Sequence, residues 1–110
     1  MSLPSYSPEN ISMLIRIKAK KKDLDKVIME AYKTIVVTHK EEGCVEYRVF
    51  HMDYEVMIFG TWTNSKSLEL HLLLQYHLNL VEEILPPLSK KISIKIYKEL
   101  EPPITALSVQ

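Results

Sequence analysis

The sequence is poor in cysteine, in net charge and in long apolar runs, and each shortage excludes a class of protein. A single cysteine, Cys44, excludes an internal disulfide. Fourteen basic and fourteen acidic side chains balance, so no net field favours nucleic acid or an anionic membrane as a partner. No apolar run approaches the roughly 18 residues of a membrane-spanning helix. The first ten residues lack the basic start and apolar stretch of a secretory signal, so we expect a cytoplasmic protein.

The chain is long enough for one domain. It has 110 residues, of which 46% are hydrophobic, and this suffices for one modest core but not for two. We assign residues 11–100 to the domain and residues 1–10 to an N-terminal extension, whose first three residues are typical of an addition made in cloning. Residues 101–110 form a C-terminal tail, for which we leave two alternatives open: it reaches across to a partner, or it is disordered.

Apolar periodicity predicts the order of the elements. Alternation of apolar and polar residues predicts strands over 11–18, 44–51, 56–62 and 92–97, the second and third joined by a tight reversal at Met52 and Asp53. Helical spacing predicts a first helix from Asp23, as its N-cap, to about Lys40. Asn64 caps a second helix, and a short third helix over 78–85 ends at two prolines. The predicted order is therefore βαββααβ.

This order is typical of the ferredoxin-like split arrangement, an α+β fold whose antiparallel sheet carries helices on one face only. The other face then needs a cover, because Met57 and Phe59 alternate with Val56 and Ile58 and make both faces apolar. We therefore expect a homodimer that forms through the sheet faces.

Several side chains are candidates for a small pocket between sheet and helices. His71 is the best candidate base, because imidazole titrates near neutral pH and the neighbouring Leu68 and Leu72 indicate a helix packed on the sheet. Trp62, at a strand end, is a candidate pocket wall. Tyr47 shares the strand face of Val45 and Val49, so its hydroxyl could donate to a substrate oxygen. The other candidate substrate contacts are His77 and Tyr32.

The four histidines do not predict a metal site. No tight ligand motif links His39, His51, His71 and His77, and His71 and His77 are six residues apart, on different sides of an ideal helix. Cys44 stands without neighbouring ligands and is interpreted as a small buried hydrophobe. Arg16 alternates onto the sheet face opposite Ile15 and is expected in an interface salt bridge.

Three pieces of the sequence together resemble one family. Glu-Glu-Gly-Cys-Val-Glu-Tyr at 41–47, Thr61-Trp62 at a strand end, and His71 nine residues after Trp62 look like the antibiotic biosynthesis monooxygenase domain family over residues 11 to about 100. The resemblance implies a dimeric α+β barrel with a pocket between sheet and helices, often used by oxygenases that need neither flavin nor metal. Ile15 and Val81 stand where the haem-degrading members carry an Asn and a ligand His, which argues against haem.

Three hypotheses for function follow. The first is a cofactor-independent monooxygenase that acts with dioxygen on a small aromatic hydroquinone, with His71 as proton acceptor. The second is an isomerase of a small phosphorylated or keto compound, in which the same histidine moves a proton and anion-binding groups are needed. The third is a dimer that binds a small ligand without catalysis. A pocket with His71 inside favours catalysis, and a leucine-filled one with His71 turned to solvent favours binding.

Overall fold

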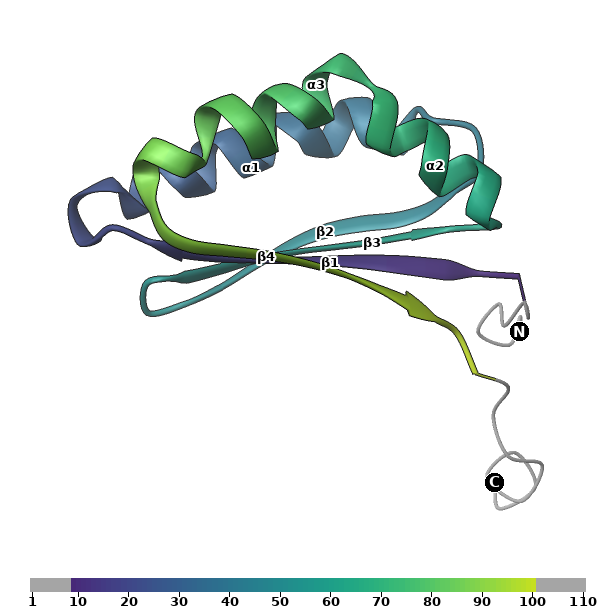
Figure 1. Ribbon diagram of the computed structural model, residues 1–110, viewed down its shortest axis with the longest axis horizontal. Coiled ribbons are helices and arrows are strands. Elements are labelled where there is room, and N and C mark those ends of the chain that lie inside the picture. Colours follow the sequence, from purple (N-terminus) through teal and green to yellow (C-terminus); the bar gives the residue numbers. More distant parts are fainter. Residues whose placement is uncertain (1–8, 101–110) are drawn as a thin grey trace.

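One antiparallel sheet of four strands, in the order β2-β3-β1-β4, forms the base of the molecule (Figure 1). The strands are β1 (Ile11–Ala19), β2 (Cys44–Met52), β3 (Glu55–Trp62) and β4 (Ser89–Lys98). The computed structural model describes residues 9–100. The predicted tail 101–110 and most of the predicted extension 1–10 therefore lie outside the described residues.

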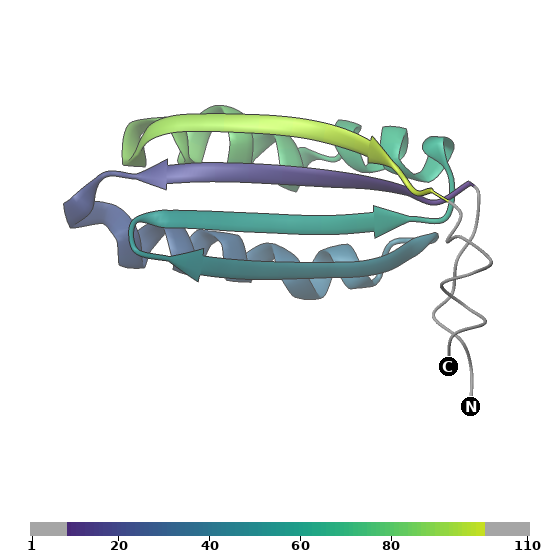
Figure 2. The same ribbon diagram turned by 90° about the horizontal axis from the view of Figure 1, so that it is seen from below.

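All the helices lie on one face of this sheet (Figure 1), and the view from below shows the other face bare of helices (Figure 2). They are α1 (Leu24–His39), α2 (Ser65–Leu73), α3 (Gln75–Leu78), a π-helical turn (Asn79–Ile84) and two 3-10 turns (Lys21–Asp23, Pro86–Leu88). The α+β ferredoxin-like fold and its βαββααβ order are confirmed. Within residues 9–100 no helix has the length and apolar character to cross a membrane.

The core lies between the sheet and the helices. The side chains of Met13, Ile15 and Ile17 on the inner strand β1 face the helices and are fully buried. Val27 and Ala31 meet them from α1, at the helical spacing that predicted the buried stripe. Each large side chain buried in this way stabilises the fold by about 1.5–3 kcal/mol.

The first helix differs from its prediction in two ways. Asp23 precedes it, but the Asp23 side chain makes no capping hydrogen bond, because a 3-10 turn leads the chain into the helix instead. Thr34 and Thr38 are buried on its inner face. Their hydroxyls donate to the carbonyl oxygens of Ala31 and Thr34 at 2.7 and 2.6 Å, which satisfies them within the helix.

The second strand begins with a bulge that the alternation did not predict. The register shifts between Cys44 and Glu46, so Val45 has no place in the ladder and is 42% exposed. The prediction that Val45 shares the face of Tyr47 is therefore wrong. At the other end of this strand the two-residue loop is Asp53-Tyr54, one residue later than predicted, with Asp53 at φ +52°.

The outer strand β4 is only partly covered. Ile94 pairs with Ile15 and Ile96 pairs with Met13, so both isoleucines lie on the helix-covered side of the sheet. They are nevertheless 42% and 46% exposed. The helix layer therefore protects the central strands better than this edge.

Candidate active site

Six side chains from five segments gather between the sheet and the helices. They come from the turn after α1, from the two strands β2 and β3, and from α2 and α3. They are Glu41, Tyr47, Trp62, His71, Tyr76 and His77. We call this set the histidine cluster.

A buried carboxylate and imidazole form its centre. His71 is 1% exposed, and its Nδ1 lies 2.7 Å from Glu41 Oε2. Because a carboxylate only accepts hydrogen bonds, the proton of this bond belongs to Nδ1, and the lone pair of the neutral ring is on Nε2. Burial lowers the pKa of His71, while the hydrogen bond and charge of Glu41 act in the opposite direction. The pair therefore presents an oriented imidazole whose Nε2 can accept a proton.

Trp62 fixes this pair from the sheet side. Its indole Nε1 donates to Glu41 Oε1 at 3.1 Å, and its ring lies 4.6 Å from the His71 ring, centroid to centroid. Gly60 makes room for the indole, because a Cβ there would lie 2.7 Å from Trp62 Cη2 and 2.8 Å from Tyr47 Cδ1. Gly60 therefore leaves the space that these two rings occupy.

Two local features hold Glu41 and α2 in place. Gly43 adopts φ +87°, a conformation that favours glycine, and its carbonyl accepts from Thr63 N at 2.8 Å. This bond ties the turn that carries Glu41 to the end of β3. Asn64 then caps α2 as predicted, its Oδ1 accepting from Ser67 N at 2.9 Å.

The helix breaks between the two histidines. Leu74 has extended backbone angles, φ −70° and ψ 140°, so α2 ends and α3 starts in a new direction. The His71 and His77 rings consequently lie 4.7 Å apart, and the prediction that they lie on different sides of one helix is wrong. Burial, with a smaller effect from His71, lowers the pKa of His77 to about 4. Both imidazoles are therefore neutral at pH 7.

Within the described part of the chain, three polar atoms of the cluster are buried without a hydrogen-bond partner. They are His71 Nε2, His77 Nδ1 and the hydroxyl oxygen of Tyr76, whose ring lies 5.9 Å from the His71 ring. Buried polar groups are nearly always paired, since an unpaired one costs about 1–3 kcal/mol. The three atoms, one of them on His71 itself, leave the cluster with hydrogen-bonding capacity that no described residue uses.

The two predicted tyrosines lie in different surroundings. Tyr47 is 2% exposed, and its ring lies 6.0 Å from the His71 ring and 6.3 Å from the Trp62 ring. The Tyr47 hydroxyl is hydrogen-bonded to the Thr34 hydroxyl at 3.3 Å, so it is already paired with a residue of α1. Burial raises the pKa of Tyr47, so this hydroxyl stays protonated. Tyr32 is 55% exposed on α1, and the structure does not bring it into the cluster.

Sequence reasoning missed two members of the cluster. Glu41 was named only as part of the stretch 41–47 that carries the family resemblance, and Tyr76 was not singled out. The one available signal for Glu41 was its place in the stretch 41–47, and for Tyr76 its place beside His77. Neither signal reports burial, which depends on the tertiary packing.

No metal ligand set accompanies the cluster. Across residues 9–100 there is no group of three or more His, Cys, Asp or Glu side chains that could hold a metal ion.

Burial raises the pKa of Cys44 to about 11, with smaller effects from Glu41 and Glu46. The thiol is therefore a poor nucleophile at neutral pH.

Comparisons with known proteins bear on the fold. A scan against protein-family models finds no match, and neither does a sequence search of curated proteins. Solved structures do match. A Deinococcus radiodurans protein provisionally named an antibiotic biosynthesis monooxygenase superposes with a TM-score of 0.77 at 19% identity, over 84% of this chain and 94% of that one.

Two further structures agree. A Nitrosomonas europaea protein with the same provisional name has a TM-score of 0.78 at 10% identity, over 90% of this chain and 98% of that one. A Bacteroides thetaiotaomicron protein of unknown function, suggested as an oxidoreductase, has a TM-score of 0.75 at 22% identity, over 84% and 100%. The predicted resemblance to the antibiotic biosynthesis monooxygenase domains is confirmed at the level of the fold.

Proposed function

We propose that the histidine cluster is the active site of a cofactor-independent monooxygenase that acts on a small aromatic hydroquinone. The observation that carries the proposal is the Glu41–His71 pair, which holds one imidazole nitrogen and leaves Nε2 buried and unpaired. A general base needs this combination of fixed orientation, neutral charge and free lone pair. The provisional names of the structural neighbours favour the same class of reaction.

The reaction then follows from the substrate's own electrons. His71 Nε2 takes a phenolic proton, and the resulting anion transfers one electron to dioxygen. The semiquinone and superoxide so formed combine at a ring carbon to a hydroperoxide, and loss of water from it leaves a new ring oxygen. One hydroquinone and one dioxygen give one hydroxyquinone and one water, so no external reductant is needed.

The remaining side chains of the cluster orient the ring. The Tyr76 hydroxyl and His77 Nδ1 are the two further unpaired polar atoms, and they suit the oxygens of a substrate that carries more than one. The indole of Trp62 and the ring of Tyr47 supply flat walls beside His71. The proposal therefore uses Tyr47, Trp62, His71 and His77 of the predicted site, and it does not use Tyr32.

Substrate must reach a nearly closed site. The helical layer is interrupted at Leu74, where α2 stops, and the side chains of Leu73 and Leu74 there are 73% and 37% exposed. We propose that the aromatic substrate enters past this break, between α2 and α3. On this path a hydroquinone ring would first contact the exposed leucine side chains and then the buried rings of the cluster.

We further infer that the active species is a homodimer. Leu14, Phe59, Met57 and Phe50 follow one another across the bare face of the sheet by strand register, and Phe50 is 38% exposed. An apolar centre on a face without helices favours association with a second copy. Sedimentation equilibrium measures this directly, and a monomer at all concentrations would contradict it.

The proposed reaction is tested by oxygen uptake. The protein is given reduced naphthoquinols, and uptake is corrected for spontaneous oxidation. We expect protein-dependent uptake that falls about 10²–10⁴-fold in His71→Asn, the range for loss of a general base. His51→Gln, which changes an exposed histidine on β2, is the matched control and should keep the activity. Uptake that is equal in His71→Asn and wild type would remove His71 from the mechanism.

The isomerase hypothesis uses the same proton transfer and separates from the oxygenase by its indifference to dioxygen. Turnover of a keto compound under nitrogen, lost in His71→Asn, would favour it. Ligand binding without turnover in air or nitrogen would favour the non-catalytic module.

A further inference from the structure

The helix α2 carries leucines on its outer face as well as on its inner face. Five of the ten residues from 65 to 74 are leucine. Leu68 is buried against the sheet, whereas Leu70, Leu73 and Leu74 are exposed. A surface helix ordinarily has one apolar stripe toward the core and polar residues on the opposite face. The packing of α2 on the sheet does not use the three outer leucines, which we call the leucine patch.

The leucine patch is continuous but small. Spacings of three and four residues put Leu73 and Leu74 beside Leu70 on the same face of a helix. From Leu70 to Leu73 the helix rises only ~4.5 Å. A stable protein interface takes about 20–30 residues from each partner, so three leucines are too few for one. A short apolar chain is an occupant of the right size.

Backbone hydrogen bonds join the patch to the histidine cluster. The Leu74 amide donates to the carbonyl oxygen of His71 at 3.1 Å, and the Leu74 carbonyl accepts from the His77 amide at 3.1 Å. Leu74 is also the residue at which the helical layer is interrupted. The leucine patch therefore borders the proposed entry path, next to the backbone that carries both buried imidazoles.

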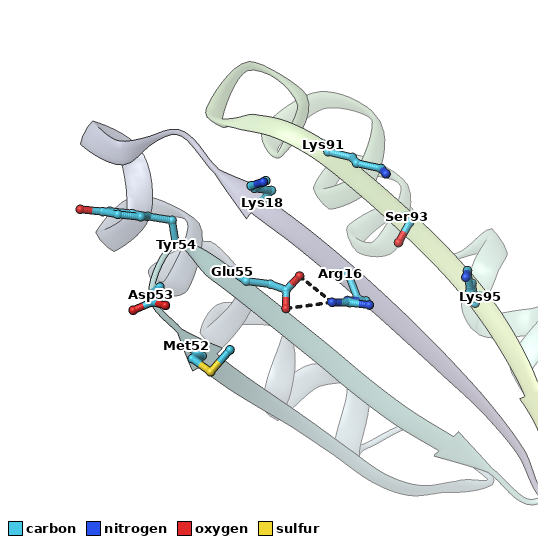
Figure 3. A pocket seen from close by; sticks show the side chains of 9 residues that line it. All are labelled: Arg16, Lys18, Met52, Asp53, Tyr54, Glu55, Lys91, Ser93 and Lys95. Atoms are coloured by element: carbon cyan, nitrogen blue, oxygen red, sulfur yellow. Dashed lines mark hydrogen bonds and ion pairs between the residues drawn. The ribbon is translucent and has the colours of Figure 1, made fainter.

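Contact between two copies of the chain would leave the leucine patch open. The bare face of the sheet holds a hollow in which Arg16 donates to both oxygens of Glu55, at 3.2 and 3.0 Å (Figure 3). Arg16 pairs with Met57 across the strands, so this hollow adjoins the apolar centre that we assign to the contact between copies. The helix α2 lies on the opposite side of the sheet (Figure 1). A second copy on the bare face would thus cover the hollow and not the leucine patch.

We propose that the substrate is a hydroquinone whose ring carries a short apolar side chain, and that this chain lies on the leucine patch while the ring lies in the histidine cluster. The proposal rests on the proposed function for its ring site and entry path. Contact with the leucines removes apolar surface of both the chain and the protein from water, which favours binding. From the length of the patch, a chain on the order of five carbon atoms, such as a prenyl group, covers it. The far end of a longer chain would extend into solvent.

The test measures binding without turnover. Oxidised naphthoquinones with no side chain, with a prenyl chain and with the longer geranyl chain are titrated into the full chain. Quenching of Trp62 fluorescence reports the ring in the cluster, because this single tryptophan lies beside His71. We expect the prenyl compound to bind roughly 10- to 30-fold more tightly than the unsubstituted one, as for about five half-buried carbon atoms. The geranyl chain should add less than about twofold, because its end has no apolar partner.

A matched pair of variants locates the chain. Leu73→Ser should reduce the advantage of the prenyl compound by roughly threefold, since it removes one of the three leucines. Met29→Ser removes an apolar side chain that is 57% exposed on α1, and it should leave the dependence on chain length unchanged. Equal binding of the prenyl and unsubstituted compounds would overturn the proposal. So would equal effects of the two variants, which would indicate unspecific adsorption, or the absence of quenching by every compound.

Oxygen uptake with the reduced compounds separates this proposal from the proposed function. Leu73→Ser should raise KM for the prenyl hydroquinone and leave kcat unchanged, because the chain lies away from the reacting ring. Uptake with the same KM for every chain length would retain the monooxygenase and overturn the chain site. Binding that depends on chain length, without any uptake, would retain the chain site and overturn the monooxygenase. If Leu73→Ser changes only sedimentation, or only binding to phosphatidylcholine vesicles, the patch is a contact with a second copy or a lipid surface and the proposal is overturned.

Discussion

The substitution Glu41→Gln probes the centre of the histidine cluster. The carboxylate is 12% exposed and accepts from two buried donors, Trp62 Nε1 and His71 Nδ1. An amide of the same shape keeps one acceptor oxygen and places an NH₂ group against the other donor. One buried N–H therefore loses its partner, which costs about 1–3 kcal/mol. We expect the free energy of unfolding to fall by about 2 kcal/mol.

The measurement uses the chain's own probe. Trp62 is the single tryptophan and is fully buried against the substituted group, so its fluorescence follows urea or thermal unfolding. A loss of about 2 kcal/mol lowers the melting temperature by roughly 8–16 °C in a domain of this size. Because Glu41 raises the pKa of His71 against the effect of burial, that pKa should also fall further in Glu41→Gln.

The control is Glu42→Gln, which changes the adjacent but exposed acid. It should leave both the melting temperature and the histidine titration unchanged. The reasoning is refuted if Glu41→Gln unfolds within about 0.5 kcal/mol of wild type, the usual range for a surface change. It is also refuted if the pKa of His71 does not move.

Three further outcomes follow from the same site. Because the pKa of His77 is about 4 when folded and 6.5 ordinarily, its contribution to stability is present above pH 6.5 and is lost as the pH falls toward 4. That loss is about 3 kcal/mol, and urea titrations at several pH values should show it reduced in His77→Gln. Gly60→Ala should destabilise by about 1–3 kcal/mol and shift Trp62 emission, because its Cβ overlaps two rings; normal stability would contradict the close approach. Tyr76→Phe should keep or raise the melting temperature, since the lost hydroxyl has no partner, yet slow oxygen uptake; a large loss of stability would instead indicate a hidden partner.

Most of the fold could be predicted from the sequence, because its signals are local and each has a direct physical cause. The alternation of apolar and polar residues predicted β1. The N-cap near residue 64 and the prolines at 86 and 87 predicted where the helices begin and end. These signals act within a few residues, so one chain is enough to find them.

The site was predicted only in part, because its geometry depends on departures from regular structure. The bulge at Val45 and the break at Leu74 depart from the periodicity of the sequence, because tertiary packing determines the backbone at both places. Periodicity therefore placed His77 wrongly relative to His71. Glu41 and His71 are 30 residues apart in the sequence, and no local pattern reports a contact over such a separation.

The partly covered strand β4 has a consequence for the solubility of the chain. Within residues 9–100 it pairs only with β1, so its outer edge carries unpaired backbone groups next to the exposed Ile94 and Ile96. Such an edge is a template for strand addition and aggregation. Lysines at 90, 91, 95 and 98 run along this strand, and charge repulsion between copies opposes that pairing. The lysines of β4 thus keep an open sheet edge from joining another.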